Sequence, residues 1–169
     1  MRADGDLLKR LKSGDQQTWS QFYGDWVQPL YNFIRSNGVY DQSDIEEVLG
    51  ETWLAAPKAI KNFDGQNATL KTFLFSLARR KIADHWRKHK PVQDLPESIS
   101  FSHSTQESLE LREVLARIPD HERQALILRY LEGFSVQEIA NTLGRTYKGT
   151  ESLLSRARKR LEEELNGKR

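Results

Sequence analysis

One stretch near the C-terminus constrains the fold more than any other. Residues 133–161 read GFSVQEIANTLGRTYKGTESLLSRARKRL, which predicts two helices joined by a tight turn. Ser135 and Glu138 have the spacing of a capping box at the start of the first helix. Gly144 then provides the left-handed backbone that commonly ends a helix. Because a second helix follows at once, the stretch has the form of a helix-turn-helix.

The second of these helices has two different faces. One face is apolar at steps of three and four and predicts a buried seam, made of Tyr147, Thr150, Leu154, Ala157, Leu161 and Leu165. The opposite face carries side chains that suit base edges and phosphates, namely Lys148, Glu151, Ser152, Ser155, Arg156 and Lys159. A surface hairpin with a charged face is the alternative, but the basic, serine-containing face favours DNA binding. Glu151 could accept from a cytosine amino group, repel phosphate, or pair with Lys148.

The rest of the chain has helical periodicity without strand alternation, which predicts an all-α fold. An aromatic-rich helix is expected from Asp15 to Gly38, with a kink at Pro29. An acidic helix follows from a capping box at Ser43–Glu46, and Pro57 bends or breaks it near its end. A basic helix is expected from about Thr69 to Lys88.

Residues 89–103 lack any helical period and contain two prolines, which is typical of a linker. The expected organisation is therefore an N-terminal helical domain at 1–88, a flexible linker at 89–103, and a C-terminal domain at 104–169 that ends in the helix-turn-helix.

The helices of the second domain have their own signals. A capping box at Ser104–Glu107 predicts the start of a helix with Leu111 on its inner face. Pro119 ends that helix, and Asp120 caps the next one, which has Leu131 on its inner face.

Charge is segregated along a chain whose formal net charge is only +2. Residues 39–57 contain five acids and no Lys or Arg, whereas residues 79–90 and 145–161 each contain six bases and one acid. Two basic segments indicate polyanion contacts at two sites, and the acidic segment indicates a different partner.

No set of side chains typical of catalysis is visible, so the chain is predicted not to be an enzyme and to need no cofactor. It has no cysteine, which excludes disulfides and thiol catalysis. His85 and His89 are spaced to share a metal, but bases surround them and no metal site is expected. No apolar run approaches the roughly 18 residues of a membrane span, and the start of the chain does not predict a signal peptide. A cytoplasmic protein is expected.

Four segments carry a resemblance to a known family. They are residues 44–53 (DIEEVLGETW), 72–74 (TFL) with 78–87 (ARRKIADHWR), 115–119 (LARIP) with 123–126 (RQAL), and 155–161 (SRARKRL). In this order they resemble bacterial RNA polymerase sigma factors of the extracytoplasmic-function group, over nearly the whole chain. Gly50 stands where that family usually has Gln, Phe73 replaces the usual Trp, and Lys148 occupies a place often held by Gly.

The resemblance implies a sigma factor that binds core RNA polymerase and directs promoter-specific transcription initiation, with an anti-sigma factor as a partner left open. The acidic helix would bind the clamp helices of the polymerase through Asp44, Glu47 and Glu51. The minus-ten element would be held by Phe63, Asn67, Lys71, Arg79, Arg80, Lys81, Asp84, Arg87 and Lys88. The outer face of the recognition helix would contact the minus-thirty-five element, and the linker would thread toward the RNA exit path.

Alternatives stay open beside this resemblance. Asp84 could simply pair with Arg80 or Lys88 four residues away, and Phe63 could be a core residue. The alternative function is a stand-alone helix-turn-helix regulator that binds duplex operator as a dimer. The acidic helix and the basic helix before the linker favour the sigma factor.

Overall fold

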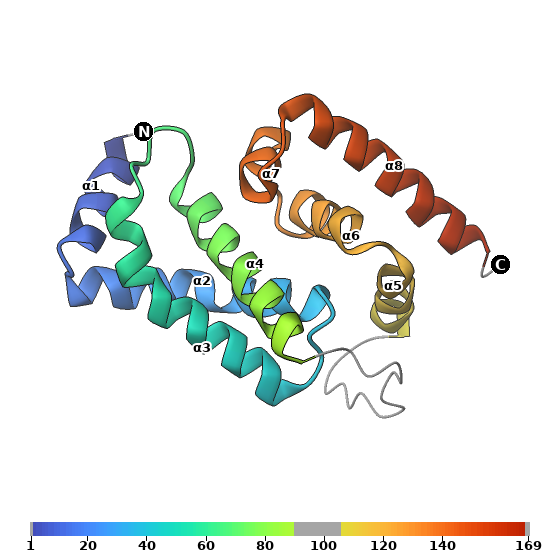
Figure 1. Ribbon diagram of the computed structural model, residues 1–169, viewed down its shortest axis with the longest axis horizontal. Coiled ribbons are helices and arrows are strands. Elements are labelled where there is room, and N and C mark those ends of the chain that lie inside the picture. Colours follow the sequence, from blue (N-terminus) through green and yellow to red (C-terminus); the bar gives the residue numbers. More distant parts are fainter. Residues whose placement is uncertain (1, 90–105, 168–169) are drawn as a thin grey trace.

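The structure is a computed structural model that describes residues 2–89 and 106–167. All regular elements in these two ranges are helices, which confirms the all-α prediction. The helices form two groups, α1–α4 and α5–α8, that lie against each other (Figure 1). The predicted linker, apart from His89, lies outside the described residues. Across the described helices, none combines the length and apolar character needed to cross a bilayer.

The N-terminal group contains four α-helices and one short 3₁₀ turn. They are α1 (Arg2–Lys12), α2 (Gln16–Ser36), α3 (Gln42–Ala59), η1 (Ile60–Asn62) and α4 (Leu70–Lys88). Asp15 caps α2 by accepting a hydrogen bond from the backbone N–H of Gln17, as predicted. Pro29 lies inside α2 and Pro57 inside α3, and both helices continue through them. Pro57 was expected to bend or break α3 near its end; α3 is not broken at Pro57 itself but ends two residues later, at Ala59, where it tightens into η1.

The start of α3 differs from the prediction. The N-cap is Asp41, whose carboxylate accepts from the backbone N–H groups of Ser43 at 2.9 Å and Asp44 at 3.3 Å. The capping box placed at Ser43–Glu46 was therefore wrong. A carboxylate two residues earlier already satisfies the free N–H groups and interacts favourably with the positive end of the helix dipole.

The C-terminal group contains the predicted helix-turn-helix. Its elements are α5 (Gln106–Arg117), α6 (Asp120–Leu126), the π-helical turn η2 (Ile127–Leu131), α7 (Val136–Leu143) and α8 (Tyr147–Asn166). Ser135 and Glu138 form both bonds of the capping box, at 3.1 Å and 2.8 Å. Gly144 ends α7 with a φ of 64°, as predicted.

Four expectations about α5, α6 and η2 were wrong or fall outside the described residues. Asp120 is the first residue of α6, not its cap, and pairs with Arg123 at 2.6 Å. Leu131 is exposed because the π-helical turn contains an extra residue and rotates the following register. Leu111 is also exposed. The capping box at Ser104–Glu107 begins outside the described residues.

The apolar seam of α8 is shorter than predicted. Thr150, Leu154 and Ala157 are buried, whereas Tyr147 and Leu165 at the two ends are exposed. Leu153, which the pattern omitted, is fully buried. The buried part of α8 therefore runs from Thr150 to Ala157, and Leu161 beyond it is half-buried.

Among the described residues, the larger apolar cluster runs across both groups of helices, and a smaller one lies within the C-terminal group. Phe75 of α4 is fully buried and packs edge-on against Phe33 of α2, with ring centres 5.1 Å apart. On its other side it packs against Phe134, just before α7, at 5.0 Å. Phe134 is itself fully buried. The two groups are therefore joined by an aromatic contact between residues far apart in the sequence.

Candidate nucleic-acid interface

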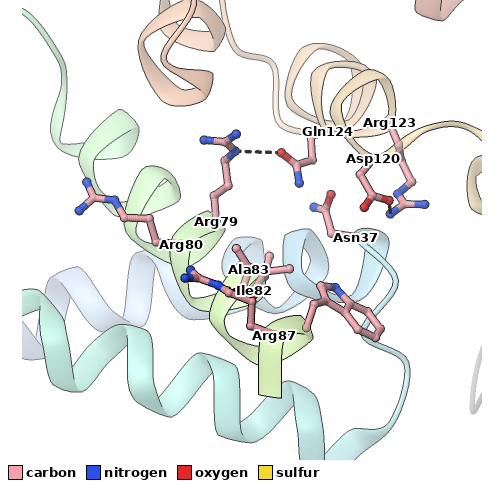
Figure 2. Close-up of a pocket in the computed structure, with 10 residues that line it drawn as sticks. Asn37, Arg79, Arg80, Ile82, Ala83, Arg87, Asp120, Arg123 and Gln124 are labelled. Carbon is pink, nitrogen blue, oxygen red and sulfur yellow. Dashed lines mark hydrogen bonds and ion pairs between the residues drawn. The ribbon is translucent and has the colours of Figure 1, made fainter. Parts of the chain in front are cut away.

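The basic residues of α4 fall into two sets. Arg80 and Arg87 are exposed. Arg79 is half-buried, and its Nε donates to Oε1 of Gln124 on α6 at 3.0 Å (Figure 2). Burial, reinforced by the nearby guanidinium of Arg145, lowers the pKa of Arg79. In Figure 2, Arg80 points away from Gln124 and toward open solvent. Arg80, unlike Arg79, is therefore available to bind a phosphate.

A cavity of about 590 Å³ lies between α4 and α6. Three arginines of α4 line one side of it, and Arg123 and Asp120 line the other. Since Asp120 already pairs with Arg123, the cavity as a whole is cationic. Its walls come from both helix groups, so its width depends on how they pack.

Asp84 pairs with Arg87, three residues away, at 2.5 Å. The predicted partners, Arg80 and Lys88, were therefore wrong; positions three and four apart are both neighbours on a helix surface. Lys88 instead lies 3.8 Å from Glu51 of α3. Asp84 thus orients an arginine of the basic face.

The polar loop of residues 63–69, between η1 and α4, is held in a defined shape. Phe63 is half-buried and packs on Phe73 of α4 with ring centres 5.1 Å apart. Gly65 has a φ of 74°, and a Cβ there would lie 2.8 Å from Leu8 of α1. The loop lines a second cavity, of about 560 Å³, together with α1 and the start of α7. Phe63 therefore belongs to the edge of the core and to the wall of this cavity.

The C-terminal helices cover part of this loop and of the first turn of α4. Nδ2 of Asn141 on α7 donates to the backbone oxygen of Asn67 at 2.9 Å. Nζ of Lys71 lies 3.8 Å from Oε2 of Glu138 and 4.0 Å from the centre of the Phe134 ring. Asn67 and Lys71, both predicted to bind DNA, are thus engaged by α7 and the residue preceding it.

Glu132 lies close enough to Lys71 to be influenced by its charge. Burial raises the pKa of its carboxyl above 4.5, and Lys71 opposes that shift. A group whose pKa is raised in the folded state contributes stability that is fully present below its unfolded pKa. This contribution is lost as the pH rises through its folded pKa. Glu132→Gln is therefore expected to raise the free energy of unfolding at pH 7, with the gain shrinking toward zero below about pH 4.5. Urea unfolding at pH 4 and pH 7 measures this, and an equal difference at both pH values would contradict it.

The outer face of α8 is free, as predicted. All six residues assigned to it are exposed and lie on one side of the helix: Lys148, Glu151, Ser152, Ser155, Arg156 and Lys159. The helix starts cleanly because Thr146 caps it, accepting from the N–H of Gly149 at 3.0 Å. Lys148 therefore does not disturb the start of the helix.

The acidic face of α3 contains one residue that the sequence patterns missed. Glu47 is exposed, and Asp44 and Glu51 are partly exposed. Leu54, one turn beyond Glu51, is 83% exposed. It is a large apolar side chain at the end of this acidic face, and it shares a surface hollow with Glu51 and with Lys81 and Lys88 of α4. Leu54 does not fit the spacing of the residues on the inner face of α3, and this mismatch was the signal in the sequence that could have identified it.

Comparison with known proteins identifies the family. The family model described as Sigma-70 region 2 matches residues 22–92, and the one described as Sigma-70, region 4 matches residues 108–161. The chain belongs to the sigma-70 family. It is a sigma factor of the extracytoplasmic-function group, which binds core RNA polymerase and directs promoter-specific transcription initiation.

Individual relatives support this assignment, and their similarity extends over most of this chain. The ECF RNA polymerase sigma factor SigM of Bacillus subtilis (strain 168) is 29% identical over 154 residues, covering 85% of this chain and 93% of SigM. CnrH, solved in complex with the cytosolic domain of CnrY, is 25% identical, with 98% of each chain covered and a TM-score of 0.78. RpoE of Bartonella quintana, solved with the anti-sigma factor NepR, has the same fold, with 24% identity, a TM-score of 0.73, and 89% of this chain and 98% of RpoE covered. The stand-alone regulator gains no support from these relatives.

Proposed function

We propose that this sigma factor binds core polymerase and the two promoter elements through three separate surfaces on different helices. The acidic face of α3 docks on the clamp helices of core polymerase through Asp44, Glu47 and Glu51, with Leu54 as an apolar contact at its end. The observation that carries the proposal is the placement of these acids on a helix separate from both basic surfaces. A docking partner and a nucleic acid can then be bound at the same time.

The minus-ten element is proposed to bind the loop of residues 63–69 and the basic face of α4. An unpaired base needs a pocket, and its neighbouring phosphates need cations. The loop at Phe63 forms one wall of such a pocket once α7 has moved away, and Arg80, Arg87 and Lys88 supply the cations. Lys81 lies on the same helix and is half-buried.

The minus-thirty-five element is proposed to bind the outer face of α8. A recognition helix presents its first turns to base edges in the major groove. Lys148, Arg156 and Lys159 fix the helix on phosphates or guanines, while Glu151 and Ser152 contact bases. Residues 1–88 and 104–169 then form the two promoter-binding domains, with 89–103 as the linker.

The described arrangement is proposed to be a closed form that opens on polymerase. Asn141 and Glu138 occupy groups that the minus-ten element would contact, and Gln124 holds Arg79. The two domains must therefore separate before that element binds. An anti-sigma factor, the kind of partner present in the RpoE structure, is proposed to prevent this separation. The sigma factor is proposed to act in the cytoplasm and to catalyse no reaction itself.

Transcription from a promoter library by core polymerase, with and without this protein, tests the proposal. Specific start sites are expected only when the protein is present, and the protein alone is expected to bind duplex promoter weakly. Tight, dimeric binding of the free protein to duplex DNA, with no effect on polymerase, would instead support a stand-alone regulator.

Arg80→Ala is expected to weaken open-complex formation at every promoter and to reduce the slope of log affinity against log salt by about one. The reason is that Arg80 is proposed to neutralise a phosphate, a contact without base preference. The measurement is promoter retention by the polymerase complex across a salt series. Arg10→Ala, which removes an equally exposed arginine from α1, is the control and should leave the slope unchanged.

Ser152→Ala is expected to change which upstream sequences are used, because a lost base contact costs about 1–3 kcal/mol at one base pair only. Transcription from a library randomised in the minus-thirty-five element measures the change. Glu162→Gln, farther along α8, is the control. A uniform loss at all upstream sequences would contradict the assignment of Ser152 to base contact.

A further inference from the structure

Three metal-ligating side chains meet where α3 packs on α4. Asp44 and Glu47 lie one turn apart on α3, and His85 reaches them from α4. One ligand atom from each lies within 4.8 Å of the other two. The three groups combine one imidazole nitrogen and two carboxylate oxygens.

His85 is the unusual member of this cluster. Its side chain is only 4% exposed, yet its Nε2 lies 3.8 Å from Oδ2 of Asp44, too far for a hydrogen bond. The ring is held by neighbours on its own helix, stacked on His89 at 4.5 Å and edge-on to Trp86 at 5.3 Å. A buried imidazole is thus fixed with a nitrogen facing two carboxylates across a gap that a cation can fill.

The ligand set does not use the histidine pair suggested by the sequence. Nδ1 of His89 lies 3.2 Å from the backbone oxygen of His85, within its own helix. The carboxylates of α3 take the place of the second histidine. The neighbouring cation Lys88 is paired with Glu51 of α3, at 3.8 Å.

We propose that Asp44, Glu47 and His85 bind a divalent transition-metal ion of the Zn²⁺, Co²⁺ or Ni²⁺ class. Imidazole with carboxylates suits these ions, whereas Mg²⁺ and Ca²⁺ prefer oxygen ligands alone. Bonds of about 2.0–2.2 Å require the three atoms to draw closer than they lie here. The exposed side chain of Glu47 can rotate to allow this, and water completes the coordination.

The bound ion would tie α3 to α4 and withdraw two carboxylates from the acidic face. Competition with core polymerase follows from this, and that consequence rests on the docking role proposed above for Asp44 and Glu47. The metal site itself does not depend on that role, so the two can be tested separately.

Titration of the tag-free, full-length protein with Co²⁺, followed by its visible absorption, tests the site without polymerase or DNA. Because the chain has no cysteine, no thiolate contributes to the spectrum. Saturable binding of one Co²⁺ that Zn²⁺ displaces is expected. Glu47→Gln and His85→Gln should each weaken Co²⁺ binding by about tenfold or more, and His121→Gln, on α6, should leave it unchanged.

The variant Glu47→Gln keeps the test valid if His85→Gln disturbs packing, since Glu47 is exposed and makes no core contact that the change would remove. Absence of saturable Co²⁺ binding would overturn the proposal. So would an affinity that Glu47→Gln leaves unchanged, or one that His121→Gln lowers as much as Glu47→Gln does.

Discussion

Leu54→Glu is expected to weaken binding to core polymerase by about 2 kcal/mol, or roughly 30-fold. Leu54 is 83% exposed, so the substitution leaves the fold intact. In the proposed complex it is an apolar contact at the end of the acidic face of α3, where a new charge would be buried without a partner. Equilibrium titration of labelled sigma factor with core polymerase measures the loss.

Leu131→Glu is the matched control, since Leu131 is also an exposed leucine but lies on η2 of the other domain. It should bind core polymerase with nearly unchanged affinity. Equal losses from the two variants, or wild-type affinity of Leu54→Glu, would remove α3 from the docking surface.

Phe134→Ala is expected to lower the free energy of unfolding by about 3–5 kcal/mol, the usual cost of emptying a fully buried aromatic position. Phe134 has no exposed surface, packs on Phe75 and carries Lys71 over its ring. Urea unfolding measures the loss. Tyr147→Ala, an exposed aromatic on α8, should change stability by about 0.5 kcal/mol or less.

The double variant of Phe75 and Phe134 shows whether the contact between the domains is the source of this cost. If the two rings stabilise each other, the double change to Ala costs less than the sum of the single changes, by about 0.5–3 kcal/mol. Strict additivity would mean that each ring is buried within its own domain and that the closed form does not exist in solution.

Local signals made the helix-turn-helix predictable. The capping box at Ser135 and Glu138 and the left-handed Gly144 depend on residues within one turn of each other, and all are present. The outer face of α8 follows from helical periodicity alone. The start of α3 was harder to predict, because Asp and Ser are both good N-cap residues. Only the backbone conformation shows that Asp41, and not Ser43, is the cap.

Features that depend on distant residues were not predictable. Phe75 was not among the predicted core residues, yet it is buried between Phe33 of α2 and Phe134 of the C-terminal domain. The engagement of Asn67 and Lys71 by α7 has the same origin. Leu131 was misplaced because a π-helical turn leaves no clear mark in the sequence. The candidate DNA-binding side chains could therefore be identified from the sequence. Which of them are free to bind DNA in this structure could not.

The aromatic contact between the domains has a consequence for a cell that stores this sigma factor. Parting Phe75 from Phe134 exposes the face of each ring that now touches the other, at a cost below the roughly 1.5–3 kcal/mol of a fully exposed Phe. Duplex chromosomal DNA presents mainly phosphates and polar base edges to a protein, so it offers little compensation for the exposed rings. The free sigma factor would then not bind chromosomal DNA until a partner protein covers those rings. Its concentration in the cell can therefore rise without an increase in nonspecific DNA binding.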